Sequence, residues 1–272
     1  GTVESNTSLN IGGKDGFDVF NTDGGATFSY DGTEKLLTIS GTIGDVLIKG
    51  RNKDNAVGCG IVIEQDANIR LTLEDLNIKA DKAFVYGDGS PGDSRGYALV
   101  LQGTNRLTST SGAGINLNGN NIIFAGSGSL TVTGGNGCAG IEAYSLLFNT
   151  DNVFVVAIGG KDAASGISGN LHHDSGFLIY GSQDDTGNFS QEYSELKGDD
   201  FTLGGDAEIP KGATVTIAAG QTFTIAPGVT LTNNGTLENN GALTNEGTFT
   251  NNGTLSGTGT VESNTSLNIG GN

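Results

Sequence analysis

The sequence predicts an all-β fold, a parallel β-helix or β-solenoid, in which wide coils of about 26 residues are followed by narrow hexapeptide coils of about 18 residues. Three observations predict it. The last quarter repeats every six residues, the preceding part repeats short apolar strands at a period of about 26 residues, and glycine fills 47 of 272 positions while proline fills only 3. This composition excludes collagen and proline-rich linkers. No stretch has sustained helical periodicity, and the segment 191–196 predicts at most one helical turn.

Six hexads run from Asn233 to Asn268, and each carries one apolar residue at the same place. Because six is even, every hexad returns its side chains to the same face of an extended chain, so three hexads can close one triangular coil. We expect the apolar residues inside, and the glycine two positions earlier where no larger side chain fits. Asparagines at the corners tolerate left-handed backbone and can bond their copies in the next coil. The apolar positions are Leu237, Leu243, Phe249, Leu255, Val261 and Leu267.

The wide coils are marked by a motif of small residues that ends in isoleucine, at Ile61, Ile115, Ile141 and Ile167. The first interval between these isoleucines is about twice as long as each of the next two, which predicts steps of two coils, one coil and one coil. We therefore divide the chain into a wide β-helix at 1–206, with the polar stretch 181–206 as the junction, and a narrow solenoid at 207–272 that runs into the next tandem unit.

The two cysteines test this register. Cys59 and Cys138 lie in similar motifs, and the interval between them is close to three coils. At about 4.8 Å per coil their Cα atoms would be about 14 Å apart, whereas a disulfide needs about 7 Å or less. The prediction is two free, buried thiols.

The two ends of the chain have the same sequence. Residues 1–13 and 259–271 both read GTVESNTSLNIGG. This repetition predicts one unit of a tandem array whose partners are neighbouring identical units, end to end. About eight wide and three narrow coils would make roughly 50 Å of rod per unit. Unpaired strand edges remain only at the ends of such a stack, where they can template the next subunit.

Two runs of the sequence, GSGSLTVTGGNGCAGI and IPKGATVTIAAGQTFTIAPGVTLTNNGTL, together with the hexads, resemble segments of large bacterial surface proteins, often from anaerobic Firmicutes. The solenoids of those proteins resemble the calcium-containing carbohydrate-binding β-helix family with a pectate-lyase-like fold. The similarity covers most of residues 36–260. It implies an extracellular location on the bacterial cell surface, and the family implies calcium and polysaccharide as ligands.

The charge of the chain excludes two kinds of partner. Its net charge is −17, and such a field repels nucleic acid and anionic membrane surfaces. No run of about 18 apolar residues exists, so we expect no membrane insertion.

Calcium is the ligand for which the sequence offers donors. Asp88, Ser90 and Asp93 fall in a short glycine-rich loop, and hard oxygen ligands of this kind suit Ca²⁺. The same pattern also fits an acidic, solvated turn. Tyr86 and Tyr97 flank the loop and are the candidate carbohydrate-binding aromatics.

Catalysis is not expected. Glycoside hydrolysis needs two carboxylates across the scissile bond. The chain carries Asn-Thr-Asp at 21–23 and 149–151 and an Asp184-Asp185 pair, but no Gly-His-Gly motif accompanies them. His172 and His173 are adjacent, so on a strand they would point to opposite faces and could not chelate one metal together. We expect both at the surface, and no catalytic residue is assigned.

Two functions of different classes follow from these patterns. The first is an extracellular structural repeat unit that forms a stiff stalk or surface filament from stacked solenoids. The alternative is a calcium-dependent carbohydrate-binding module, or adhesin, that recognises an acidic polysaccharide.

Overall fold

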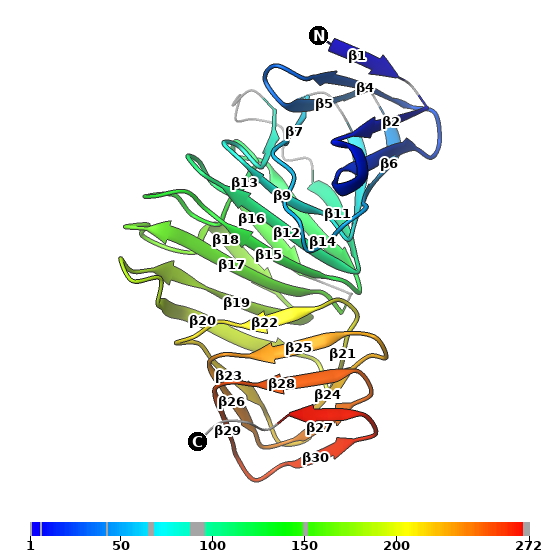
Figure 1. Ribbon diagram of the computed structural model, residues 1–272. Helices are drawn as coiled ribbons and strands as arrows, with labels where there is room; N and C mark the ends of the chain where they lie inside the picture. The colour runs from blue at the N-terminus through cyan, green and yellow to red at the C-terminus, as the bar shows by residue number, and fades with distance from the viewer. Residues whose placement is uncertain are drawn as a thin grey trace.

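The protein is a single column of stacked β-strands, seen in a computed structural model with the N-terminus at one end and the C-terminal coils at the other (Figure 1). The structure describes residues 2–5, 7–41, 43–64, 68–87, 96–148 and 152–268. Within these ranges it contains 31 strands and one 3₁₀ turn, η1 (Gly13–Asp15). Most strands pair in parallel with their equivalents in the coils before and after, so the predicted parallel β-solenoid is confirmed.

The first layers of the column differ from the rest. Strand β4 pairs antiparallel with both β1 and β5, and β3 pairs antiparallel with both β2 and β6. The predicted parallel coils from residue 1 are therefore wrong for β3 and β4. Gly12 and Gly13, at φ of +79° and +63°, turn the chain back on itself after β2. These strands are β1 (Thr2–Ser5), β2 (Ser8–Ile11), β3 (Phe17–Asn21), β4 (Ala26–Asp31), β5 (Leu36–Gly41) and β6 (Ile43–Gly50).

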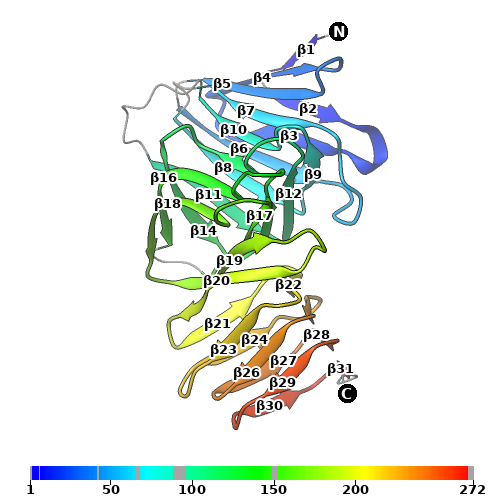
Figure 2. The same cartoon turned by 90° about the vertical axis from the view of Figure 1, so that its left-hand side faces the viewer.

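The wide coils follow from β7 to β19 (Figure 2). Ile61 is joined to Ile115 through Phe84 of the coil between them, while Ile115 pairs with Ile141 and Ile141 with Ile167. The predicted steps of two, one and one coil are thus confirmed. The strands are β7 (Gly60–Ile63), β8 (Asn68–Glu74), β9 (Asn77–Ala80), β10 (Phe84–Tyr86), β11 (Gly96–Gln102), β12 (Thr104–Ser109), β13 (Ile115–Asn116), β14 (Asn121–Gly126), β15 (Ser129–Thr133), β16 (Ile141–Phe148), β17 (Phe154–Lys161), β18 (Ile167–His173) and β19 (Gly176–Gln183).

A strand reversal separates the wide coils from the narrow ones. Strand β20 (Phe189–Lys197) pairs antiparallel with β19, and the turn between them falls in the polar stretch expected to break the pattern. The helical turn expected at 191–196 is wrong, because β19 offers a full strand edge on which this segment pairs its backbone.

The narrow solenoid has three faces, each a parallel sheet of its own. Along these faces Leu237 pairs with Leu255 and Leu243 with Val261, each three hexads further along the chain. The strands are β21 (Asp200–Leu203), β22 (Ala207–Ile209), β23 (Thr214–Ile217), β24 (Thr222–Ile225), β25 (Thr230–Asn233), β26 (Thr236–Asn239), β27 (Ala242–Asn245), β28 (Thr248–Asn251), β29 (Thr254–Ser256), β30 (Thr260–Ser263) and β31 (Ser266–Asn268). The narrow coils thus begin at β21, just before the predicted boundary at 207.

The apolar hexad residues stack inside the narrow solenoid as predicted, except at its end. Leu237, Leu243 and Phe249 are buried and Leu255 is half-buried, while Val261, in the last described strand of its face, is 39% exposed. The side chain of Leu267 lies outside the described residues.

The hexad glycines lie where no side chain fits. A Cβ at Gly247 would lie 2.2 Å from the Val229 carbonyl oxygen, and its equivalents are equally close to backbone. The asparagines bond from coil to coil, with Asn233 Nδ2 donating to Asn251 Oδ1 at 2.7 Å. Between 233 and 252 no asparagine has a positive φ, so the expected left-handed corners are wrong; sequential bends suffice at this coil width.

The core is continuous across the boundary between wide and narrow coils. Phe177 of the last wide coil stacks on Phe154 at 4.9 Å between ring centroids and contacts Phe223 of the narrow solenoid at 6.1 Å. Cys59 is buried and Cys138 half-buried, and both thiols are free. Cys138 is less buried than expected because it lies in a turn, after Gly137 at φ +73°.

Candidate functional site

The predicted calcium loop, with Asp88, Ser90 and Asp93, lies outside the described residues. Tyr97 lies in β11, where it pairs with Ile122, but its side chain is likewise not described. Tyr86 is 2% exposed and packs in the core. Its ring therefore has no open face for a sugar, and its proposed stacking role does not fit its position.

Burial of Tyr86 follows from the alternation of its strand. Phe84 pairs with Ile61 and Tyr86 with Ile63, so all four side chains point inward, while Val85 between them is only half-buried. Elsewhere in the described ranges, no group of three or more His, Cys, Asp or Glu side chains could hold a metal ion. Nor does this part of the chain contain a helix able to cross a membrane.

The carboxylates of the hydrolase-like motifs have structural partners. Asp184 accepts hydrogen bonds from Thr186 and Asn188 in the turn after β19, and these bonds lower its pKa to about 2. Asp185 forms an ion pair with Lys161 at 2.6 Å. Asp23 accepts a hydrogen bond from the Gly25 amide in a turn. The second Asn-Thr-Asp motif lies outside the described residues.

A polar chain that the sequence did not indicate lies where β20 closes the wide helix. His173 Nδ1 is 3.0 Å from the Tyr193 hydroxyl, which donates to Glu195 Oε2 at 2.5 Å, and Lys197 Nζ donates to Glu195 Oε1. The Tyr193 ring stacks on Tyr180 at 5.3 Å between centroids.

The environment of this chain sets the pKa values of its members. Burial lowers the pKa of His173, and burial with the Glu195 hydrogen bond raises the pKa of Tyr193. His172 and His173 point to opposite faces as predicted, but His173 is buried rather than at the surface. Within the described part of the chain His173 Nε2 has no hydrogen-bond partner but is buried, and the Tyr193 hydroxyl is bonded to Glu195, so we assign these side chains a structural role.

A basic groove lies on the side of the wide helix, with a volume of about 450 Å³. Lys35, Lys79 and Lys82 line it, and all three are exposed. Glu34 and Asp81 also line it, yet among the described residues no ion pair involves any of the three lysines. In a chain with net charge −17, the groove gathers 3 of the 13 basic residues. Sequence reasoning missed it because its lysines come from segments far apart in the chain: Lys35 lies in the turn before β5, Lys79 in β9 and Lys82 just after β9.

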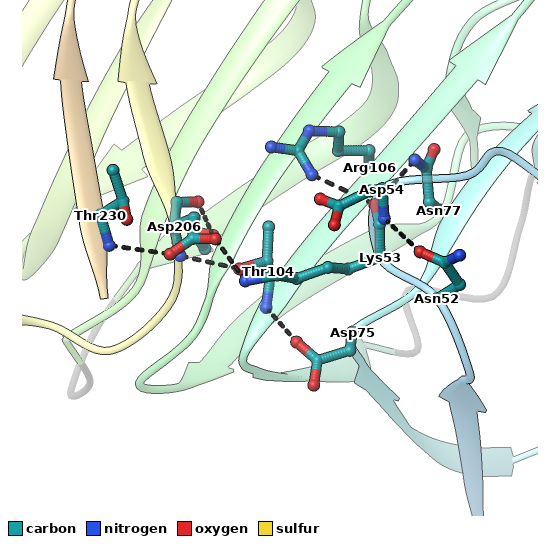
Figure 3. A network of polar contacts seen from close by, with 10 residues as sticks. Asn52, Lys53, Asp54, Asp75, Asn77, Thr104, Arg106, Asp206 and Thr230 are labelled. Atoms are coloured by element: carbon teal, nitrogen blue, oxygen red, sulfur yellow. Dashed lines mark hydrogen bonds and ion pairs between the residues drawn. The ribbon is translucent and has the colours of Figure 1, made fainter. Parts of the chain in front are cut away.

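Asp206 joins the two solenoids (Figure 3). Its carboxylate forms an ion pair with Lys53, 153 positions earlier, and accepts a hydrogen bond from the Thr230 amide at 2.8 Å. Its own amide donates to Thr104 Oγ1 at 2.7 Å, and its carbonyl oxygen accepts from Ser129 Oγ at 2.6 Å. We call these five residues the Asp206 network.

The network fixes the first narrow coil on the side of the wide helix. Lys53 follows β6, Thr104 begins β12 and Thr230 begins β25, so the carboxylate and the backbone amide of one residue link elements of both solenoids. A Cβ at Gly205 would lie 1.9 Å from the Gly103 carbonyl oxygen, so only glycine permits this close approach. The aromatic core and the Asp206 network together make the two solenoids one column.

The two ends of the column expose strands of identical sequence. At one end β1 and β2 form the outermost strands of the first sheet, and at the other β30 and β31 are the outermost strands of two narrow faces. Among the described residues, each of these strands pairs along one edge. Such unpaired edges can accept a further strand.

Comparison with protein-family models, curated proteins and solved structures finds no significant match to this chain. Function must therefore be argued from the geometry.

Proposed function

We propose that the chain is a structural repeat unit of a stiff extracellular rod, a stalk or filament on a bacterial cell surface, built from identical units that follow one another end to end. The proposal assigns it no catalytic activity. The extracellular location rests on the resemblance of its sequence to bacterial surface proteins.

One observation carries the proposal: the same 13 residues stand at both ends of one uninterrupted column. A rod made of such units needs stiffness within each unit, and here the shared aromatic core and the Asp206 network provide it. It also needs ends that can be continued. The outermost strands at the two ends give this because an unpaired strand edge is a template for a further strand.

The test is the shape of a two-unit chain in which residues 1–258 are followed directly by residues 1–272. Small-angle scattering should give a rod about 50 Å longer than the single chain, as expected for roughly eleven further coils at about 4.8 Å each. A matched control carries a flexible Gly-Ser linker between two complete copies and should scatter as two jointed bodies. If the direct fusion scatters like the linker control, the chain is not a rod unit.

A second candidate is the binding of an acidic polysaccharide, and the basic groove favours it. Three lysines without ion pairs in the described ranges could pair with uronate carboxylates, although exposed pairs of this kind are each worth only about 0.2–1 kcal/mol. Binding would therefore depend on several groups along one polymer. Calcium enters this candidate only through Asp88 and Asp93.

Retention on insoluble pectin, with calcium or with a chelator, tests this candidate. Changing Lys35, Lys79 and Lys82 to Gln should abolish retention if the groove binds. Retention that needs calcium and is lost in the Asp88→Ala, Asp93→Ala variant would instead assign binding to the loop.

The matched control for the groove variant changes Lys14, Lys49 and Lys211 to Gln, which gives the same net charge. Equal losses in the two lysine variants would indicate general charge attraction, and no retention at all would reject the candidate.

A further inference from the structure

We propose that the repeated segment is a shared joint between two copies of this chain. In the joint, β30 and β31 of one unit pair in parallel with β27 and β28 of that unit along one edge. Along the other edge they pair antiparallel with β4 and β3 of the next unit, in the places that β1 and β2 occupy here. The inference rests on the proposed rod and specifies its partner.

The segment has the same strand spacing in both copies. Two residues separate β1 from β2 in the N-terminal copy and β30 from β31 in the C-terminal copy. The serine that ends the first strand bonds the backbone two residues on in both, through different groups: Ser5 Oγ accepts from the Thr7 amide, whereas Ser263 Oγ donates to the Thr265 carbonyl oxygen. The two strands of one copy can therefore take the places of the two strands of the other.

The two copies use opposite sides of the segment. The partners of β1 and β2 are β4 and β3, which lie on the side toward the rest of the chain, so the free edge faces outward at the N-terminal end. The partners of β30 and β31 are β27 and β28 in the preceding coil, so the free edge faces outward at the C-terminal end. The edge left free in one copy is the edge paired in the other.

The direction of the backbone groups agrees with this. In an extended strand, the N–H and C=O groups of successive residues point to opposite edges. In the C-terminal copy, the Thr260 and Asn264 amides donate to Gly241 and Asn245 of the preceding coil, at 2.9 and 3.1 Å. In the N-terminal copy, the carbonyl oxygen of Thr7, which corresponds to Thr265, instead accepts from β3. Neighbouring positions of the segment thus serve opposite partners, and a single copy can satisfy both.

Chain direction and the inward face also match. Strand β4 is antiparallel to both β1 and β5, so β1 runs in the direction of the parallel coils, as β30 does. Leu9 and Ile11 are buried in the N-terminal copy. In the C-terminal copy the backbone register aligns Val261 with the buried Leu243, and position 267, the equivalent of Leu9, with the buried Phe249. The position that aligns with the core at one end is therefore the one that is buried at the other. The joint would also cover Val261, now 39% exposed.

A deletion test follows from the redundancy of the two copies. A variant that lacks residues 1–12 exposes the edges of β3 and β4, and the C-terminal copy of a second molecule should fill them. We expect linear head-to-tail oligomers that grow with concentration in analytical ultracentrifugation, with β-structure retained by circular dichroism. The control variant, which also lacks residues 259–272, should not oligomerise. If the first variant is folded and monomeric throughout, or if both oligomerise equally, the joint is wrong.

Amide exchange in the two-unit chain gives a second test should the deletion variant fail to fold. In the single chain, alternate amides of 260–268 should exchange freely. At the fused joint all should be protected, with the previously free ones slowed at least about 100-fold, as expected of paired strands. If the two-unit chain is a rigid rod but alternate amides of 260–268 still exchange freely, the proposed joint is wrong and the proposed rod function still stands. A two-unit chain with a hinge would reject both.

Discussion

Replacing Leu243 by alanine tests whether the narrow solenoid is held together by the stacked hexad residues. Leu243 lies between Phe223 and Val261 on one face, and it has no exposed surface. Removing three buried carbon atoms where the glycine-lined coil cannot collapse should cost about 2–5 kcal/mol. Val261→Ala is the matched control on the same face. Since Val261 is 39% exposed, its truncation should cost less than about 1 kcal/mol.

Native-state hydrogen exchange is the suitable assay, because the chain has no tryptophan and no tyrosine after Tyr193 to report on the narrow coils. Amides of β27 that open with the coil should exchange about 30- to 4,000-fold faster in Leu243→Ala, at tenfold per 1.4 kcal/mol. A change below about tenfold, or an equal effect of Val261→Ala, would refute the view that the stacked side chains hold the coils together. In the two-unit chain, the joint predicts that Val261→Ala at the junction becomes the costlier change.

Three further predictions concern glycine, the Asp206 network and pH. Gly247→Ala should destabilise the narrow coils by more than about 2 kcal/mol, because the new Cβ would lie within 2.4 Å of two carbonyl oxygens. Gly228→Ala, in open space at φ +78°, should cost about 1 kcal/mol. Urea titration followed by circular dichroism compares the free energies of unfolding of the two variants. Asp206→Ala should speed exchange of the amide that begins β25, which loses its acceptor, and unchanged exchange would contradict the network's role.

Because burial lowers the pKa of His173, the unfolded chain takes up its proton first. Stability should therefore fall as pH drops from about 6.5 through the lower folded pKa. Urea midpoints at pH 7 and 5 should show this loss in the wild type and in His172→Phe but not in His173→Phe.

The parts of the fold that repeat were predictable from the sequence, since an even hexad period and isoleucines one coil apart both constrain which residues face inward. The alternation of inward and outward side chains along a strand also predicts a buried Tyr86, because Tyr86 lies two residues after the apolar Phe84. The Asp206 network and the basic groove were not predictable, because they depend on distant contacts. Lys53 forms an ion pair with Asp206, 153 positions later in the chain, and no local sequence pattern specifies this contact.

The two antiparallel regions could not be predicted from local patterns either, and both arise where the chain changes from one type of coil to the other. A parallel ladder pairs each strand with its equivalent one coil later, so it tends to keep successive coils similar in path. The chain changes coil type twice. The first change is at β3 and β4, where the repeated segment of β1 and β2, whose sequence is typical of a narrow coil, is followed by the wide helix. The second is at β20, where the wide helix is followed by the narrow coils.

At both places the chain reverses. The reversed strands β3, β4 and β20 each pair antiparallel with a strand to which a short turn joins them, namely β2, β5 and β19, and such a hairpin does not require a coil of matching length. Beyond β20 the coils then tighten, because the step from Phe201 to its partner Phe223 is longer than the step from Phe223 to Leu243 on the same face. The next step, from Leu243 to Val261, is shorter again. Strand reversal therefore lets solenoids of two widths share one axis. In the proposed joint, the reversed β3–β4 layer would be what adapts the narrow end of one unit to the wide beginning of the next.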